Sequence, residues 1–322
     1  MKPPYVITPR ILKSIASISQ LIGRLEVKFI AKQHPELRKK NRIKTIHSTL
    51  NIEGNTLTEE QITALIEKKR VIGPAKDIRE VMNALEAYSE LKRYNYRSQK
   101  DFLKAHKLLM AGLVNDPGKY RTTGVGIVKG SNIKHIAPPH KNVPYLMNDL
   151  FEYLRNDDEL TLIKSCVFHY EMEFIHPFMD GNGRMGRLWQ TIILMSDFPI
   201  FEYLPFETLI SKNQTAYYKS LSDSDKQGNS TKFIEFMLKI IEKSLEELFQ
   251  NRSKRPDGEQ RLSAYLEQVK GEFTRSDYLK YYAEISTATA SRDLRVGVEN
   301  KLIKKYGDKK TTRYKTLGKG AR

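Results

Sequence analysis

The 322-residue sequence has one cysteine, one tryptophan and no long apolar run. The single cysteine, Cys166, excludes an intrachain disulfide, and its apolar neighbours predict a core position. Nowhere do eighteen apolar residues follow one another, and the amino terminus has no apolar run of signal-peptide length. We therefore expect no membrane contact and a cytoplasmic protein. No internal repeat is visible.

Acidic residues are outnumbered, with 38 Asp and Glu against 55 Lys and Arg, for a formal net charge of +17. The basic excess lies at the ends, because residues 1–50 and 252–322 each carry +9 while residues 51–251 carry −1. Such ends are typical of polyanion contact, and equally of solvated lysine-rich faces. A hydrophobic content of 39% predicts a folded globular chain.

The spacing of apolar residues at three and four positions predicts a mainly α protein through residues 10–250. The exception is Tyr120–Ile136, where β-branched residues broken by glycines predict a hairpin at about 122–134. The polar, basic stretch 251–258 contains Pro and Gly and marks a domain boundary. We expect an amino-terminal helical region at 1–90, a catalytic core at 91–250 and a separate module at 251–322.

One stretch, residues 176–187, combines groups suited to nucleotide chemistry. A turn bracketed by Gly181 and Gly183 that opens a helix presents unpaired N–H groups and the positive end of the helix dipole, which favour a phosphate. Arg184 and Arg187 share a helix face and can bind a polyphosphate, and the stretch also holds a carboxylate suited to a divalent metal. His176 is the natural acceptor of a hydroxyl proton. Each group alone also fits a turn, a cap or a surface arginine, but twelve residues containing all of them favour an active site.

Zinc is the alternative reading of the same histidines. His169, His176 and Asp180 are ligand types, but the two histidines are seven residues apart and no cysteine or further carboxylate–histidine pair completes a site. The sequence therefore favours phosphate chemistry.

The segment His176–Arg187 resembles the signature of the Fic family, His-x-Phe-x-Asp/Glu-Gly-Asn-Gly-Arg-x-x-Arg, without a departure. The resemblance extends to residues 169–175, 118–121 and 83–88 and covers roughly residues 1–250. It implies a helical Fic core with a hairpin flap, and transfer of AMP from ATP to a Ser, Thr or Tyr hydroxyl of a protein, the chain itself included, with Mg²⁺ as cofactor. It further implies a role for each site residue: His176 as base, Asp180 for the metal, Gly181, Asn182, Gly183, Arg184 and Arg187 for the phosphates, and Thr122, Gly124, Val125, Gly126 and Ile127 as a flap that docks the target by strand addition.

Upstream, Ser48–Asn55 resembles the inhibitory motif of the same family, with Thr49, Glu53 and Gly54 in the key places. We expect Glu53 to pair with Arg187, so that the γ-phosphate of ATP loses its partner and the nucleotide binds unproductively. This would place the chain in the subclass with an amino-terminal inhibitory helix. The alternatives are a plain helix end with Gly54 as its C-cap, or a glutamate that activates water to remove AMP from modified proteins.

The carboxy-terminal module reads as three helices and a basic hairpin, and it resembles a winged helix-turn-helix domain. Residues suited to DNA contact are Thr289, Arg292, Arg295, Lys309, Lys310 and Arg313. Protein contact or dimerisation is the alternative, and a transcription regulator using the core as a nucleotide sensor is a rival function. The sequence leaves open the protein target, any DNA site and the oligomeric state, a homo-oligomer included.

Overall fold

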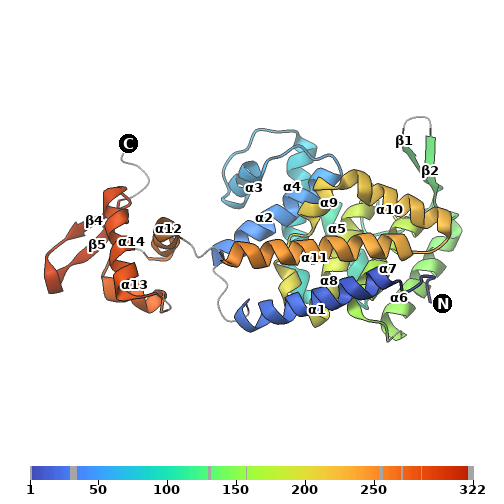
Figure 1. Ribbon diagram of the computed structural model, residues 1–322. Helices are drawn as coiled ribbons and strands as arrows, with labels where there is room; N and C mark the ends of the chain where they lie inside the picture. The colour runs from blue at the N-terminus through green and yellow to red at the C-terminus, as the bar shows by residue number, and fades with distance from the viewer. Residues whose placement is uncertain are drawn as a thin grey trace. The chain divides into compact units, whose positions relative to one another are not determined.

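The computed structural model describes residues 2–29, 35–129, 132–156, 158–253, 257–269, 271–283 and 285–317. The chain divides into two compact units, residues 1–249 and 250–322 (Figure 1). Both units are mainly helical, which confirms the predicted fold class. No helix in these ranges is long and apolar enough to cross a membrane.

The first unit is a helical bundle around one apolar core. Its helices are α1 (Pro9–Phe29), α2 (Pro35–Ile52), α3 (Glu59–Ile66), α4 (Ala75–Ser89), α5 (Gln99–Leu109), α6 (Val143–Asn156), α7 (Thr161–Ile175), α8 (Asn182–Asp197), α9 (Glu207–Lys212), α10 (Gln214–Gln227) and α11 (Thr231–Ser253), with short 3₁₀ turns η1 (Leu91–Arg93), η2 (His140–Asn142) and η3 (Pro199–Glu202). Residues 1–90 pack into the same core as the rest of the unit.

Helices α7 and α8 lie at the centre of this bundle. Both are buried on nearly all sides, and polar side chains such as Lys164 and Arg187 are buried together with the apolar ones. Phe102 of α5 packs edge-on against Trp189 of α8 at 5.1 Å between ring centroids and against Phe151 of α6 at 5.5 Å. The loop that joins α7 to α8 is therefore held at both ends by the most rigid part of the core.

Helices α1 and α11 run side by side along one face of the bundle (Figure 1). The hydroxyl of Thr8 donates to Glu235 of α11 at 2.8 Å, and Ser230 N donates to the carbonyl of Pro4 at 3.0 Å. These bonds tie the amino-terminal segment to the last helix of the unit.

The predicted hairpin is present as strands β1 (Gly126–Lys129) and β2 (Asn132–Ile136), which pair antiparallel. The register shifts between Ile127 and Val128, whose partners are His135 and Ile133, so the extra residue of the β-bulge, Lys134, lies in the second strand. The tip of the hairpin, residues 130–131, lies outside the described residues.

The second unit contains α12 (Gly258–Gln268), α13 (Arg275–Tyr281), α14 (Thr287–Glu299), strands β3 (Glu272–Phe273), β4 (Ile303–Tyr306) and β5 (Arg313–Thr316), and the turn η4 (Lys309–Thr311). The three helices and the hairpin β4–β5 match the expected order, but β3 was not predicted because two residues carry no periodicity. The strands form an antiparallel sheet in the order β3-β5-β4. Leu262, Tyr265, Tyr278, Leu294 and Ile303 form a separate core.

Candidate active site

The loop between α7 and α8 is set by two left-handed residues. His176 ends α7 at φ 49°, with its N–H bonded to the carbonyl of Met172 at 3.0 Å, and Pro177 cannot continue the helix. Gly181, at φ 88°, precedes the first residue of α8, and no side chain caps that helix. The N–H groups of the first turn of α8 are therefore available to an anion, directly after His176.

Internal hydrogen bonds fix the shape of this loop. The amide of Asn182 folds back onto Phe178, donating to its carbonyl and accepting from its N–H, both at 2.9 Å. The Asn182 side chain therefore braces the turn, while its backbone lies at the anion-binding end of α8. A Cβ on Gly181 would approach the sulfur of Met110 to 2.7 Å, so both the space and the backbone angle require glycine.

His106 of α5 supports the same loop from outside the sequence motif. Its Nδ1 accepts from Gly118 N at 2.8 Å, so Nε2 carries the proton and donates to the carbonyl of Asp180 at 3.0 Å. The imidazole also stacks on Phe178, with ring centroids 3.5 Å apart. Burial lowers the pKa of His106 to about 4, which keeps this tautomer neutral.

Arg121 links the catalytic loop to the base of the hairpin. Its guanidinium donates to the carbonyls of His176 at 2.8 Å and Thr123 at 3.0 Å, and also to that of Pro138, which follows β2. Its backbone N–H donates to Pro177 O at 2.9 Å. The side chain is only 3% exposed, and within the described residues its guanidinium donates to backbone carbonyls rather than to a carboxylate.

Arg184, the first arginine of the motif, is buried between two carboxylates. It donates to Glu80 of α4 at 3.0 Å and to Asp180 at 2.9 Å. The other oxygen of Glu80 accepts from the amide of Asn55 at 2.8 Å, the last residue of the stretch that resembles the inhibitory motif. Arg184 is thus connected to that segment through one carboxylate.

Arg187, the second arginine, is fully buried and is held by the expected inhibitory residues. It donates to the hydroxyl of Thr49 at 2.8 Å, to the Thr49 carbonyl at 3.0 Å and to the carboxylate of Glu53 at 2.6 Å. Burial acts to lower the pKa of Arg187, but the nearby carboxylate of Glu53 raises it above its ordinary value. The contact expected from the sequence is therefore present in the structure.

Glu53 also lies over the anion-binding turn. A Cβ added to Gly183 would collide with the Glu53 carboxylate and approach Arg187 to 3.0 Å. Glu53 follows the last residue of α2, and Gly54 after it has φ 93°, a conformation that favours glycine. The carboxylate thus occupies the space that a phosphate bound close to this helix terminus would need.

The residues proposed as zinc ligands do not form a metal site in the described structure. His169 is fully buried between Gln190 at 2.7 Å and the Tyr217 hydroxyl at 3.0 Å, and burial lowers its pKa to about 3. Across the described ranges, no three His, Cys, Asp or Glu side chains come together as metal ligands.

The remaining predicted residues differ in their exposure to solvent. Thr122 and Gly124 are exposed and Val125 is half-buried, ahead of the hairpin. Gly126 and Ile127 are in β1, where only the backbone is described. In the second unit Arg292, Arg295, Lys309 and Arg313 are exposed and Thr289 is half-buried, while the Lys310 side chain lies outside the described residues.

Sequence reasoning did not assign His106, Arg121 or Glu80 to the site. Arg121 belongs to a stretch already similar to the family, which is a signal that could have found it. His106 and Glu80 lie on helices far from the motif and have no local signature, because only packing brings them to residues 176–187.

Comparison with known families matches residues 96–194 to the Fic/DOC family. A solved structure of a Fic family protein from Desulfovibrio desulfuricans is 42% identical, covers 100% of both chains and superimposes with a TM-score of 0.76. The chain belongs to the Fic/DOC family. The family resemblance of residues 176–187 is thereby confirmed.

Two curated members of the family show partial matches. Protein adenylyltransferase fic-1 of Caenorhabditis elegans is 30% identical over 217 residues, which is 62% of this chain and 40% of that protein. Protein adenylyltransferase Fic of Nematostella vectensis is 27% identical over 228 residues, 67% of this chain and 51% of that protein. The chain thus spans about half, or less, of the length of these relatives.

Proposed function

We propose that this protein transfers AMP from ATP to a hydroxyl group of a protein, and that Glu53 restrains the transfer. The observation that carries the proposal is the placement of His176 directly ahead of the open amino terminus of α8, with Arg187 buried behind the turn. The names of the partly matching relatives, both protein adenylyltransferases, support the same reaction.

His176 supplies the base for this reaction. Its imidazole takes the proton of the incoming Ser, Thr or Tyr hydroxyl, whose oxygen attacks the α-phosphorus of ATP while the bond to the β-phosphate oxygen breaks and pyrophosphate leaves. The N–H groups after Gly181 hold the phosphates, and Arg184 and Arg187 neutralise the chain of negative charge. The hairpin base at Thr122–Val125 receives an extended segment of the target by strand addition.

The donor set at Asp180 fits Mg²⁺. This carboxylate is 49% exposed at the mouth of the turn, and Mg²⁺ is usually held by one or two carboxylates together with nucleotide phosphates and waters. Asp180 would hold the ion when ATP is bound, where the ion would neutralise phosphate charge. Arg184, 2.9 Å from Asp180, keeps the carboxylate in place.

The restraint comes from competition for Arg187. A carboxylate 2.6 Å from this guanidinium and directly over Gly183 leaves the γ-phosphate of ATP without its partner. The nucleotide then binds in a pose that does not present the α-phosphate to the hydroxyl. The chain therefore belongs to the subclass with an amino-terminal inhibitory helix, here α2.

Intact-mass spectrometry of the protein incubated with ATP and Mg²⁺ tests the proposal. We expect little added mass in the wild type, AMP adducts of the protein in Glu53→Gly, and none in Glu53→Gly combined with His176→Ala. Absence of adducts in Glu53→Gly, on the protein itself and on proteins of a cell extract, would contradict AMP transfer.

The same experiment separates the rival functions. A nucleotide sensor carries no adduct in any variant. An enzyme that removes AMP requires Glu53, so the Glu53→Gly variant would then lose activity on an AMP-modified protein instead of gaining transfer.

For the second unit we propose a winged helix-turn-helix that binds DNA. The order α12, β3, α13, α14, β4, β5 with sheet order β3-β5-β4 supports this assignment. Helix α14 buries Ala290 and Leu294 and exposes Arg292 and Arg295. These arginines and the cations near the β4–β5 turn suit phosphate contact.

Fluorescence anisotropy with a labelled DNA duplex tests this second proposal. Replacing Arg292 and Arg295 by Ala should weaken binding and lower the slope of log K against log salt by about 2, since each phosphate contact contributes about 0.9. An unchanged slope, or no binding by the wild type at low salt, would contradict it.

A further inference from the structure

Helix α9 packs alongside the carboxy-terminal half of α2, the helix that presents Thr49 and Glu53. The hydroxyl of Ser48 donates to Thr208 at 3.1 Å, and Gln214, at the start of α10, donates to the carbonyl of Ile52 at 2.7 Å. The position of the inhibitory segment therefore depends on polar contacts to α9 and its neighbour as well as on the Arg187 ion pair.

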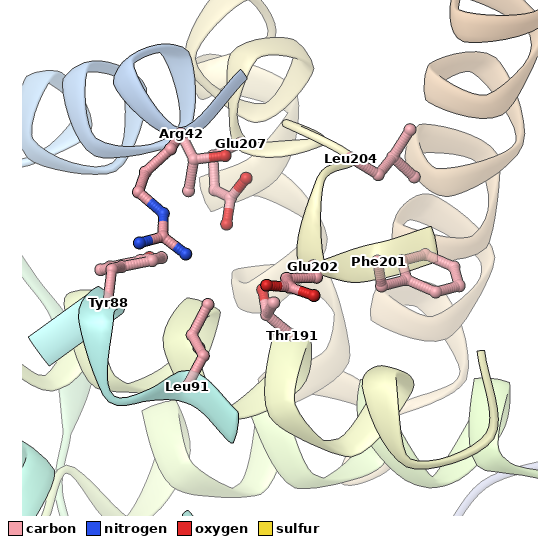
Figure 2. A pocket seen from close by; sticks show the side chains of 9 residues that line it. Arg42, Tyr88, Leu91, Thr191, Phe201, Glu202, Leu204 and Glu207 are labelled. Carbon is pink, nitrogen blue, oxygen red and sulfur yellow. The ribbon is translucent and has the colours of Figure 1, made fainter. Parts of the chain in front are cut away.

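Glu207, the first residue of α9, lies at this contact between α2 and α9 and has an unusual environment for a carboxylate. Its side chain is fully buried, and among the residues that the structure describes neither carboxylate oxygen has a hydrogen-bond partner of normal geometry. It points into a cavity of about 10 Å³, close to the least space that one water molecule needs (Figure 2). Buried carboxylates are normally paired, so this one needs a physical account.

Four elements surround the Glu207 carboxylate. The charged, titratable or hydroxyl-bearing groups that face it are Arg42 and Thr45 of α2, Tyr88 of α4, Arg187 and Thr191 of α8, and Glu202 of η3. No ion pair joins Arg42 to Glu207 in the described structure, and Glu202 is engaged with Lys92 at 2.9 Å. The Glu207 carboxylate thus lies between the inhibitory helix and the helix that carries Arg187.

The environment of Glu207 favours its neutral form. Burial raises its pKa to about 8, and its own backbone N–H, Arg187, Thr45 and Thr191 offset only part of that rise. An ionised Glu207 is costly while α2 is docked, because its side chain is buried away from bulk water. When α2 separates from α9 the carboxylate gains water, and its pKa returns toward the ordinary value of about 4.3.

We propose that Glu207 is a positioning residue for the inhibitory helix, and that its protonated form keeps α2, and with it Glu53, docked on the catalytic loop. The proposal rests on Glu53 restraining the transfer. Because the docked state binds the proton more tightly, docking is complete below about pH 4.3 and weakens by up to about tenfold per pH unit up to about pH 8. Above about pH 8 the docking of α2 weakens no further.

Hydrogen–deuterium exchange of α2, with exchange times corrected for intrinsic pH dependence, tests the docking directly. In the wild type the opening equilibrium constant of α2 should rise by about 50-fold from pH 6 to pH 8, because a carboxyl with a docked-state pKa of about 8 is half ionised at pH 8. Glu207→Gln, the neutral isostere, should show the same protection at both pH values, while the matched control Glu202→Gln should follow the wild type. His47 on α2 faces Glu59 at 3.9 Å, and both variants retain this pair.

Thr45→Val gives an independent test if Glu207→Gln does not fold. Loss of a hydroxyl that lowers the pKa of Glu207 should move the levelling-off of α2 protection to higher pH. The proposal is overturned if wild-type protection is equal at pH 6 and pH 8, or if Glu207→Gln or Thr45→Val keeps the wild-type pH profile.

Transfer activity gives a second readout. The ratio of AMP incorporation by the wild type to that by Glu53→Gly should rise with pH between 6 and 8, and the ratio cancels any pH dependence of the transfer chemistry that both proteins share. The same ratio measured in the Glu207→Gln background should be flat, and a ratio that still rises would contradict the role of Glu207. If Glu53→Gly incorporates no AMP, the proposed function fails while the exchange measurement still decides the role of Glu207.

Discussion

Removal of Glu53 should create a preference for ATP over ADP. In the wild type the guanidinium of Arg187 is already paired with Glu53 at 2.6 Å, so a γ-phosphate gains no partner and the two nucleotides should bind with similar affinity. In Glu53→Gly the guanidinium is released for the γ-phosphate. A hydrogen bond to a charged group contributes about 1.5–3 kcal/mol. Because Glu53 is 30% exposed and the site is reached by water, we take about 2 kcal/mol, which predicts about a 30-fold preference for ATP.

Isothermal titration calorimetry with ATP and ADP measures this ratio. Glu59→Gln removes a carboxylate from the neighbouring helix α3 without touching Arg187 and should leave the ratio near one. The double variant Glu53→Gly, Arg187→Ala should also return the ratio to near one. An unchanged ratio in Glu53→Gly, or a preference for ATP that survives in the double variant, would refute the competition between Glu53 and the γ-phosphate.

Three further predictions follow from the buried polar groups. Arg121→Lys, made in the Glu53→Gly background, should lower kcat for AMP transfer by about 10–100-fold with ATP affinity unchanged, because a point charge cannot replace the guanidinium contacts to the loop and the hairpin base; equal kcat values would contradict this. Burial lowers the pKa of His106 to about 4 and that of His169 to about 3, so their contribution to stability is present above about pH 6.5 and is lost as the pH falls. In denaturant unfolding below pH 6.5, the free energy of unfolding of His169→Gln should therefore fall with decreasing pH less steeply than that of the wild type, by about 1.4 kcal/mol per pH unit. In the second unit, Asp293→Ala leaves the largely buried Arg261 without its partner at 2.7 Å and should lower the free energy of unfolding by about 3 kcal/mol, with the melting of the first unit as internal control.

The local features of the site could be predicted because they depend on neighbouring residues. A proline after His176 ends a helix, and two glycines around Asn182 open the next one, whatever surrounds them. The resemblance of Ser48–Asn55 to the inhibitory motif likewise predicted that Glu53 pairs with Arg187, and the structure places both Glu53 and Thr49 on Arg187. The roles of these residues in AMP transfer remain predictions.

Other features could not be predicted because they depend on contacts distant in sequence. Glu80 and Asp180 flank Arg184, although one lies 104 residues and the other four residues from it. His106 reaches the carbonyl of Asp180 from 74 residues away. No periodicity or motif in the sequence indicates which of these distant residues contact each other, since any buried helix position could have held the same residue types.

The sequence by itself determined the mainly helical fold, the family and the chemical character of residues 176–187, because helix periodicity, turn residues and the motif are local properties of the chain. Only the tertiary structure decided what each group of the motif touches. Packing sets the Glu53 carboxylate over Gly183, anchors the backbone of His176 on Arg121, and buries Glu207 between α2 and α8 with no hydrogen bond of normal geometry to the described residues. The physical reason is that burial and charge pairing arise from the sum of long-range contacts, and these govern whether a complete set of catalytic groups is held in a restrained or a working arrangement.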